Sequence, residues 1–138
     1  MEVSFAFLCD YADQSGGKMT AVGIGFDTIY AVNVPATHPL FFPVIGIKFS
    51  STEIGQKRIG MRLIDEDGNN IIPPIDTTLN VAQPPPGFLF RTQRIVLAMH
   101  GVIFPKYGDY MVSWLVDGQE IKTVQLKVAP PPAPPITA

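Results

Sequence analysis

The chain has 138 residues, of which 46% are hydrophobic and 16% are charged, and its formal net charge is −2 at pH 7. This length suits a single domain, and the high apolar content excludes a disordered chain. Ten basic residues are scattered among twelve acidic ones, which excludes the basic surface that nucleic acids and anionic membranes attract.

Alternation of apolar residues with their neighbours predicts a first β-strand over residues 2–9. One face of this strand is expected to carry Val3, Phe5, Phe7 and Cys9. Similar segments, separated by turn residues, predict seven further strands. They are expected at residues 19–34, 40–49, 58–65, 75–81, 88–99, 110–116 and 121–128.

Two Asp-Gly pairs, Asp67-Gly68 and Asp117-Gly118, mark hairpin turns because these residues adopt the positive φ angles that tight hairpins need. Trp114 lies in the penultimate strand and is expected to pack between two sheets. About eight short strands with regular turn signals predict an all-β fold, an antiparallel immunoglobulin-like or Greek-key β-sandwich over residues 1–128. The proline-rich residues 129–138 are expected to form a flexible tail.

Several short motifs follow one another along the chain. They are Leu8-Cys9-Asp10-Tyr11-Ala12, Gly16-Gly17-Lys18, Gly23, Phe26-Asp27, His38-Pro39, Leu63-Ile64-Asp65, Asp67-Gly68, Phe104-Pro105, Gly108-x-Tyr110 and Val116-Asp117-Gly118-x-Glu120. In this order they resemble a family of bacterial proteins known as a domain of unknown function. The resemblance spans nearly the whole chain except the tail. It implies an immunoglobulin-like β-sandwich and brings no known reaction or ligand with it.

Asp65, Asp67 and Asn69 are spaced two residues apart, as are the oxygen ligands of Asp-x-Asp-x-Asn calcium loops. The glycine comes too early for such a loop, however, and no glutamate stands at its twelfth position. We therefore favour a solvated hairpin turn at this place. The alternative is a calcium or small-ligand site on the loops that carry Asp10, Asp13, Asp65 and Asp67.

Cys9 is the single cysteine of the chain and cannot form an internal disulfide. It falls in phase with apolar residues and is expected to be a buried, inert thiol. The two histidines, His38 and His100, cannot complete a three-ligand zinc site by themselves. Phosphate-binding loops and nucleophile elbows are missing from the sequence. We therefore expect no catalytic residue and no cofactor, and predict that the chain is not an enzyme.

The apolar clusters Phe41-Phe42 and Phe88-Leu89-Phe90 belong either to the core or to an exposed patch. In the second case Phe41, Phe42, Phe88 and Phe90 would contact a partner. The main hypothesis is a structural or protein-interaction module, with a second copy of the chain as one candidate partner. The first residues lack a basic secretory n-region, and no apolar run is long enough to span a bilayer, so we expect a soluble cytoplasmic protein.

Overall fold

The structure is a computed structural model that describes residues 1–133. In this range it is all-β, with eleven strands, a single 3-10 turn and no α-helix. The strands are β1 (Glu2–Cys9), β2 (Tyr11–Ser15), β3 (Lys18–Val22), β4 (Thr28–Tyr30), β5 (Ala36–Ser50), β6 (Gly55–Ile64), β7 (Ile75–Val81), β8 (Phe90–Val96), β9 (Met99–Phe104), β10 (Gly108–Val116) and β11 (Gln119–Ala129). The all-β prediction is confirmed, and the expected number of about eight strands is too low.

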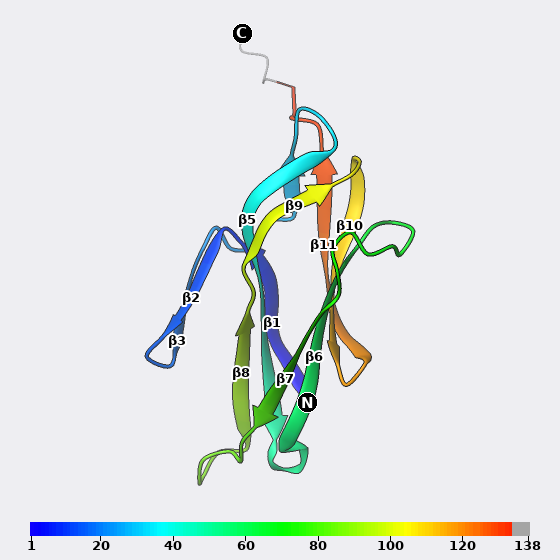
Figure 1. Ribbon diagram of the computed structural model, residues 1–138. Coiled ribbons are helices and arrows are strands. Elements are labelled where there is room, and N and C mark those ends of the chain that lie inside the picture. Colours follow the sequence, from blue (N-terminus) through cyan, green and yellow to red (C-terminus); the bar gives the residue numbers. More distant parts are fainter. Residues whose placement is uncertain (134–138) are drawn as a thin grey trace.

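The strands form two main sheets and a separate hairpin (Figure 1). One sheet has the order β4-β11-β10-β6-β7 and is mixed, because β4 runs parallel to β11 while the other pairs are antiparallel. The other sheet is built around β5, which pairs with β1, β8 and β9. The inner faces of these two sheets share one apolar core.

Strand β5 is the central strand of its sheet, because it is fifteen residues long and has pairing partners along its whole length. Its second half lies between β1 and β8, and its first half pairs with β9. Strands β8 and β9 keep one common register on β5, since Val96 faces Val44 and Met99 faces Phe41. They therefore continue one ladder along the same edge of β5, interrupted at residues 97–98.

A β-bulge in β1 changes which residues face the core. The register with β5 shifts between Val3 and Phe5, so an extra residue reverses the direction of the following side chains. Val3 packs against the main core, whereas Phe5, Phe7 and Cys9 belong to a second cluster on the opposite face. The prediction that these four residues share one face is therefore wrong for Val3.

The main core is centred on Trp114, which is 1% exposed, as expected for a side chain between two sheets. The ring of Phe104 contacts that of Tyr110 edge-on, with centroids 5.1 Å apart, and lies 6.5 Å from that of Phe41. These aromatic contacts join β5 and β9 of one sheet to β10 of the other. They fix the distance between the layers at this end of the core.

The β2–β3 hairpin forms an arm that lies against the outer face of the β5 sheet (Figure 1). Ala12 of the arm is buried with Phe42 and Val44 of β5. The Gln14 side chain donates a hydrogen bond to the backbone oxygen of Arg94, at 3.2 Å, which ties the arm to β8. Because the arm covers its outer face, β5 is buried on both sides, which explains its nearly continuous apolar sequence.

Candidate interaction surfaces

The connection between β7 and β8 carries the largest exposed apolar side chains at one end of the molecule (lower end in Figure 1). We call residues 84–90 the apolar loop. Phe88 is 69% exposed, Leu89 is 80% exposed and Phe90 is 41% exposed. Apolar side chains of this size are more often buried, so three exposed ones in a row form an unusually apolar part of the surface.

The backbone of the apolar loop is held in a tight turn. The N–H of Phe88 donates to the backbone oxygen of Pro85, at 3.0 Å, which closes a four-residue β-turn. Pro86 presets φ at the second position, and Gly87 takes the left-handed conformation at the third, with φ of 87°. The turn therefore restricts the backbone up to Phe88, and Leu89 is the residue that directly follows it.

The four predicted contact phenylalanines divide into two pairs. Phe41 and Phe42 are buried, in the main core and under the arm respectively, so they are not available on the surface of the folded chain. Phe88 and Phe90 are exposed in the apolar loop. The most exposed member, Leu89, was not among the predicted contacts, although its position between two phenylalanines after three prolines was a usable signal.

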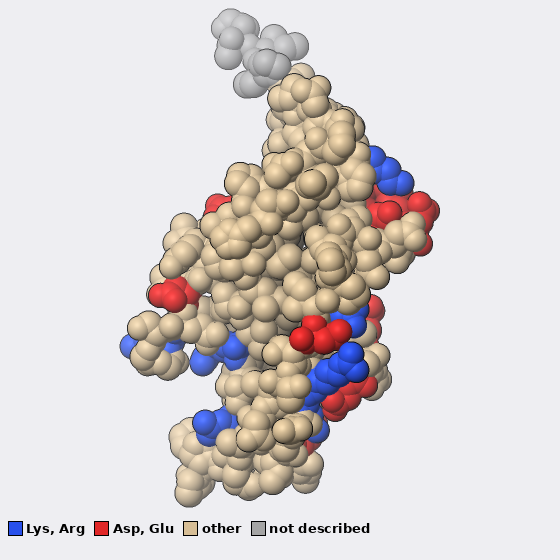
Figure 2. All heavy atoms as spheres, in the orientation of Figure 1, with Lys and Arg blue, Asp and Glu red and all other residues tan. Residues whose placement is uncertain are grey.

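A second surface is an apolar groove of about 490 Å³ between β9 and the connection from β6 to β7. One wall consists of Ile71, Ile72, Pro73, Pro74 and Ile75, and the other of residues 99–103. Figure 2 shows no charged side chain over β9 and the first half of β5, whereas charged residues gather over the lower strands and the right-hand rim. The groove thus lies in an uncharged part of the surface.

The acidic loop between β6 and β7 binds groups of the protein itself. One carboxylate oxygen of Asp65 accepts the backbone N–H groups of Asn69, at 2.9 Å, and Asp67, at 3.0 Å. These bonds, above all the one from Asn69, lower the pKa of Asp65 despite the opposing effect of desolvation. Glu66 accepts the N–H of Asp109, at 2.8 Å. The turn predicted here is confirmed, and the Asp65 carboxylate already accepts two hydrogen bonds from the backbone of the turn.

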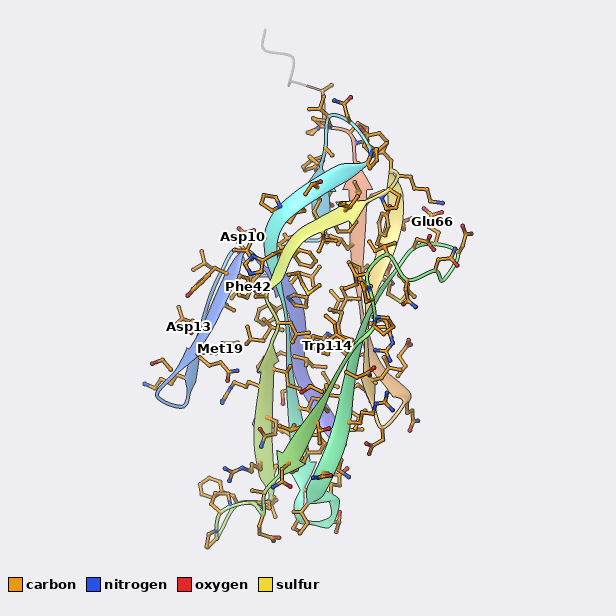
Figure 3. The ribbon with its side chains drawn as sticks, viewed as in Figure 1. Asp10, Asp13, Met19, Phe42, Glu66 and Trp114 are labelled. Carbon is orange, nitrogen blue, oxygen red and sulfur yellow. The ribbon has the colours of Figure 1, made fainter. Side chains whose placement is uncertain are left out.

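The other acidic residues of the predicted cation or ligand site lie elsewhere. Asp10 and Asp13 are at the arm, on the opposite side of the molecule from Glu66 (Figure 3). Within residues 1–133, no three histidine, cysteine, aspartate or glutamate side chains are grouped closely enough to hold a metal ion. The structure therefore does not bring the arm and the acidic loop together.

Cys9 is fully buried beneath the arm, as expected. Its thiol is 3.4 Å from the backbone oxygen of Tyr11 and 3.5 Å from that of Phe42. Burial raises the pKa of this thiol, which keeps it protonated. His38 lies against the rings of Phe26 and Phe41, and burial lowers the pKa of its imidazole. His100 is exposed on β9 and lines the apolar groove.

Comparison with protein families matches residues 4–129 to the model of DUF6941, a family of unknown function. The chain belongs to the DUF6941 family. The match confirms the resemblance to a domain of unknown function and leaves fold and taxon unspecified. A search of curated proteins gives no match.

The DUF6941 match includes both apolar surfaces, because residues 71–75, 84–90 and 99–104 all lie within it. It ends with β11 at Ala129, before the proline-rich residues. Of the predicted tail, residues 134–138 lie outside the described residues. In the described part of this DUF6941 member, no helix has the length and apolarity needed to cross a membrane.

Proposed function

We propose that this DUF6941 member is a non-enzymatic interaction module that holds a protein partner through the apolar loop. The proposal rests on the exposure of two neighbouring side chains: Phe88, the last residue of a turn closed by a hydrogen bond, and Leu89 directly after it. A few anchor residues near the centre of an interface supply most of its binding energy, and aromatic side chains are prominent among them.

The energetic argument follows from burial and pre-organisation. Fully burying a leucine or phenylalanine side chain contributes about 1.5–3 kcal/mol relative to leaving it in water. A rigid turn loses little conformational entropy on binding, so more of this free energy remains as affinity. Arg91 and Arg94 follow the loop on β8. A partner with an apolar pocket and carboxylates at its rim would complement this end of the molecule.

The test is site-specific photo-crosslinking in cells of the native host. A photoreactive residue replaces Leu89 in one variant and the 77% exposed Val32 in the control. Val32 belongs to the segment between β4 and β5, which lies at the end of the molecule opposite the apolar loop (Figure 1). A partner that is crosslinked from position 89 and not from position 32 is then purified for binding measurements.

The double substitution Phe88→Ser and Leu89→Ser should weaken binding of that partner at least 30-fold, which corresponds to loss of about 2 kcal/mol. The thermal unfolding midpoint should stay unchanged, because both side chains are solvent-exposed. Equal binding by the wild-type chain and the double variant would overturn the proposal. Crosslinking from position 32 with none from position 89 would do the same.

We further propose that the two main sheets are a variant of the immunoglobulin-like arrangement. In immunoglobulin domains the last two strands pair, and the penultimate strand also pairs with strand C. Strands β11, β10 and β6 have this order. Tyr110, at the start of β10, donates its hydroxyl hydrogen to the backbone oxygen of Lys106, at 2.6 Å, and accepts the N–H of Lys106, at 3.3 Å. Immunoglobulin-like sandwiches use a tyrosine in this way at the corresponding corner.

Tyr110→Phe should therefore lower the free energy of unfolding by about 1–3 kcal/mol, because it leaves backbone groups of Lys106 without their partner. Tyr11→Phe is the matched control. Tyr11 is 49% exposed on the arm, and its substitution should change the stability by less than about 0.5 kcal/mol. Urea denaturation of both variants measures the difference. Equal stabilities of the two variants would contradict a structural role for the Tyr110 hydroxyl.

A further inference from the structure

Strands β8 and β9 leave a free edge on the β5 sheet, interrupted at residues 97–98. Both pair with β5 in one common register, so their backbones share the edge that faces away from β5. No strand of residues 1–133 pairs with this edge. A free edge presents unpaired N–H and C=O groups that a further strand can join.

The two halves of this edge differ in how they are protected against such pairing. Strand β8 carries Arg91 and Arg94, and charges of one sign repel when a strand meets its own copy. Strand β9 has the sequence Met-His-Gly-Val-Ile-Phe, without lysine, arginine, aspartate or glutamate. The exposed edges of β1, β7 and the arm each include a charged residue, and β4 is only three residues long.

The side chains around β9 are also unusually apolar for a surface. Ile103 is 55% exposed on the strand. The groove of about 490 Å³ runs beside residues 99–103 and has an isoleucine- and proline-rich opposite wall. Figure 2 shows that this surface is free of charged side chains. A partner that covers it need not supply compensating charges.

We propose that two copies of this chain associate by antiparallel pairing of β9 with β9 about a two-fold axis. A two-fold interface brings the same surface of each copy together, so charged groups on that surface can meet groups of the same sign. A surface without charge avoids this repulsion. The pairing would join the two β5 sheets into one and bury the uncharged groove of each copy. This inference goes beyond the proposed function, because β9 and the apolar loop are different surfaces made of different residues.

The association state of the full chain tests the inference. Analytical ultracentrifugation between about 1 μM and 1 mM, the range in which weak dimers are populated, should show a monomer–dimer equilibrium. Ile103→Lys places a charged side chain on the apolar strand of each copy, which opposes edge pairing, and should raise the dissociation constant at least tenfold. Ile54→Lys is the matched control. Ile54 is 49% exposed and precedes β6, away from β9, so the dissociation constant should stay within a factor of two of the wild-type value.

Hydrogen exchange locates the contact independently of any substitution. Amides of residues 99–104 should exchange more slowly at high protein concentration, whereas those of residues 84–90 should not change. Circular dichroism and thermal unfolding at low concentration confirm that both lysine variants are folded. If Ile103→Lys does not fold, the concentration-dependent protection of β9 in the wild-type chain decides the question.

A monomer at every concentration would overturn the inference and leave the proposed function of the apolar loop untouched. A dimer with concentration-dependent protection only at residues 84–90 would also overturn it, and would assign self-association to the apolar loop. Protection of β9 that appears only when a different protein is added would overturn it in favour of a partner that donates a strand.

Discussion

Replacing Trp114 by alanine is expected to lower the free energy of unfolding by about 3–5 kcal/mol. Trp114 is one of the largest side chains in the core and is 1% exposed. The cavity beside it measures only about 10 Å³, so alanine would leave a much larger void between β10 and the strands that carry Ile59 and Ile95. Domains of this size are stable by about 5–15 kcal/mol, so this loss is a large fraction of the total.

Trp114→Phe provides the control for this prediction. The indole Nε1 has no hydrogen-bond acceptor among the described residues, so phenylalanine keeps most of the packing and removes no internal hydrogen bond. Its cost should stay below about 1.5 kcal/mol. Urea denaturation followed by circular dichroism measures both variants without relying on tryptophan fluorescence. Equal losses in the two variants would contradict this prediction, because they would show that a phenyl ring replaces none of the packing of the indole.

A second large difference is expected between two phenylalanines that the sequence alone does not distinguish. Phe41→Ala should cost about 3–5 kcal/mol, because its ring is fully buried against Phe26 and Phe104. Phe88→Ala should change stability by less than about 0.5 kcal/mol, because Phe88 lies on the surface. Thermal and urea unfolding of the two variants check the comparison.

The variants Phe41→Ala and Phe88→Ala also distinguish an effect on stability from an effect on partner binding. The Phe88→Ala variant should fold like the wild-type chain and bind the partner of the apolar loop more weakly. Because Phe41 is not exposed to solvent, its substitution should weaken binding of the partner only by lowering the fraction of folded protein. Similar losses of stability at both positions would mean that the apolar loop is part of the core.

Local sequence patterns predict the class of this fold and several of its strands. The pair formed by β10 and β11 follows from alternation around Asp117-Gly118, where both residues have positive φ. The strand predicted at residues 40–49 lies within β5. The turn at Asp65 is also predicted from its residues. Each of these features depends on interactions between neighbours in the chain.

Features that depend on distant partners are not visible in the same patterns. The bulge in β1 comes from its pairing with β5, and it places Val3 and Phe5 on opposite faces. The segment predicted as one strand over residues 88–99 contains an exposed loop end, β8 and the start of β9. Phe41 and Phe88 both stand in apolar clusters, and the contacts that bury the first and expose the second come from other strands.

The placement of the apolar loop has a spatial consequence. Strand β11 runs along the molecule for eleven residues, which is about 35 Å at the usual rise of a β-strand, and ends at the pole opposite the loop (Figure 1). Its final residues pair with β10 on one side and with the parallel strand β4 on the other. A partner bound at the loop and the residues that directly follow Ala129 would therefore lie at opposite ends of the molecule (Figure 1).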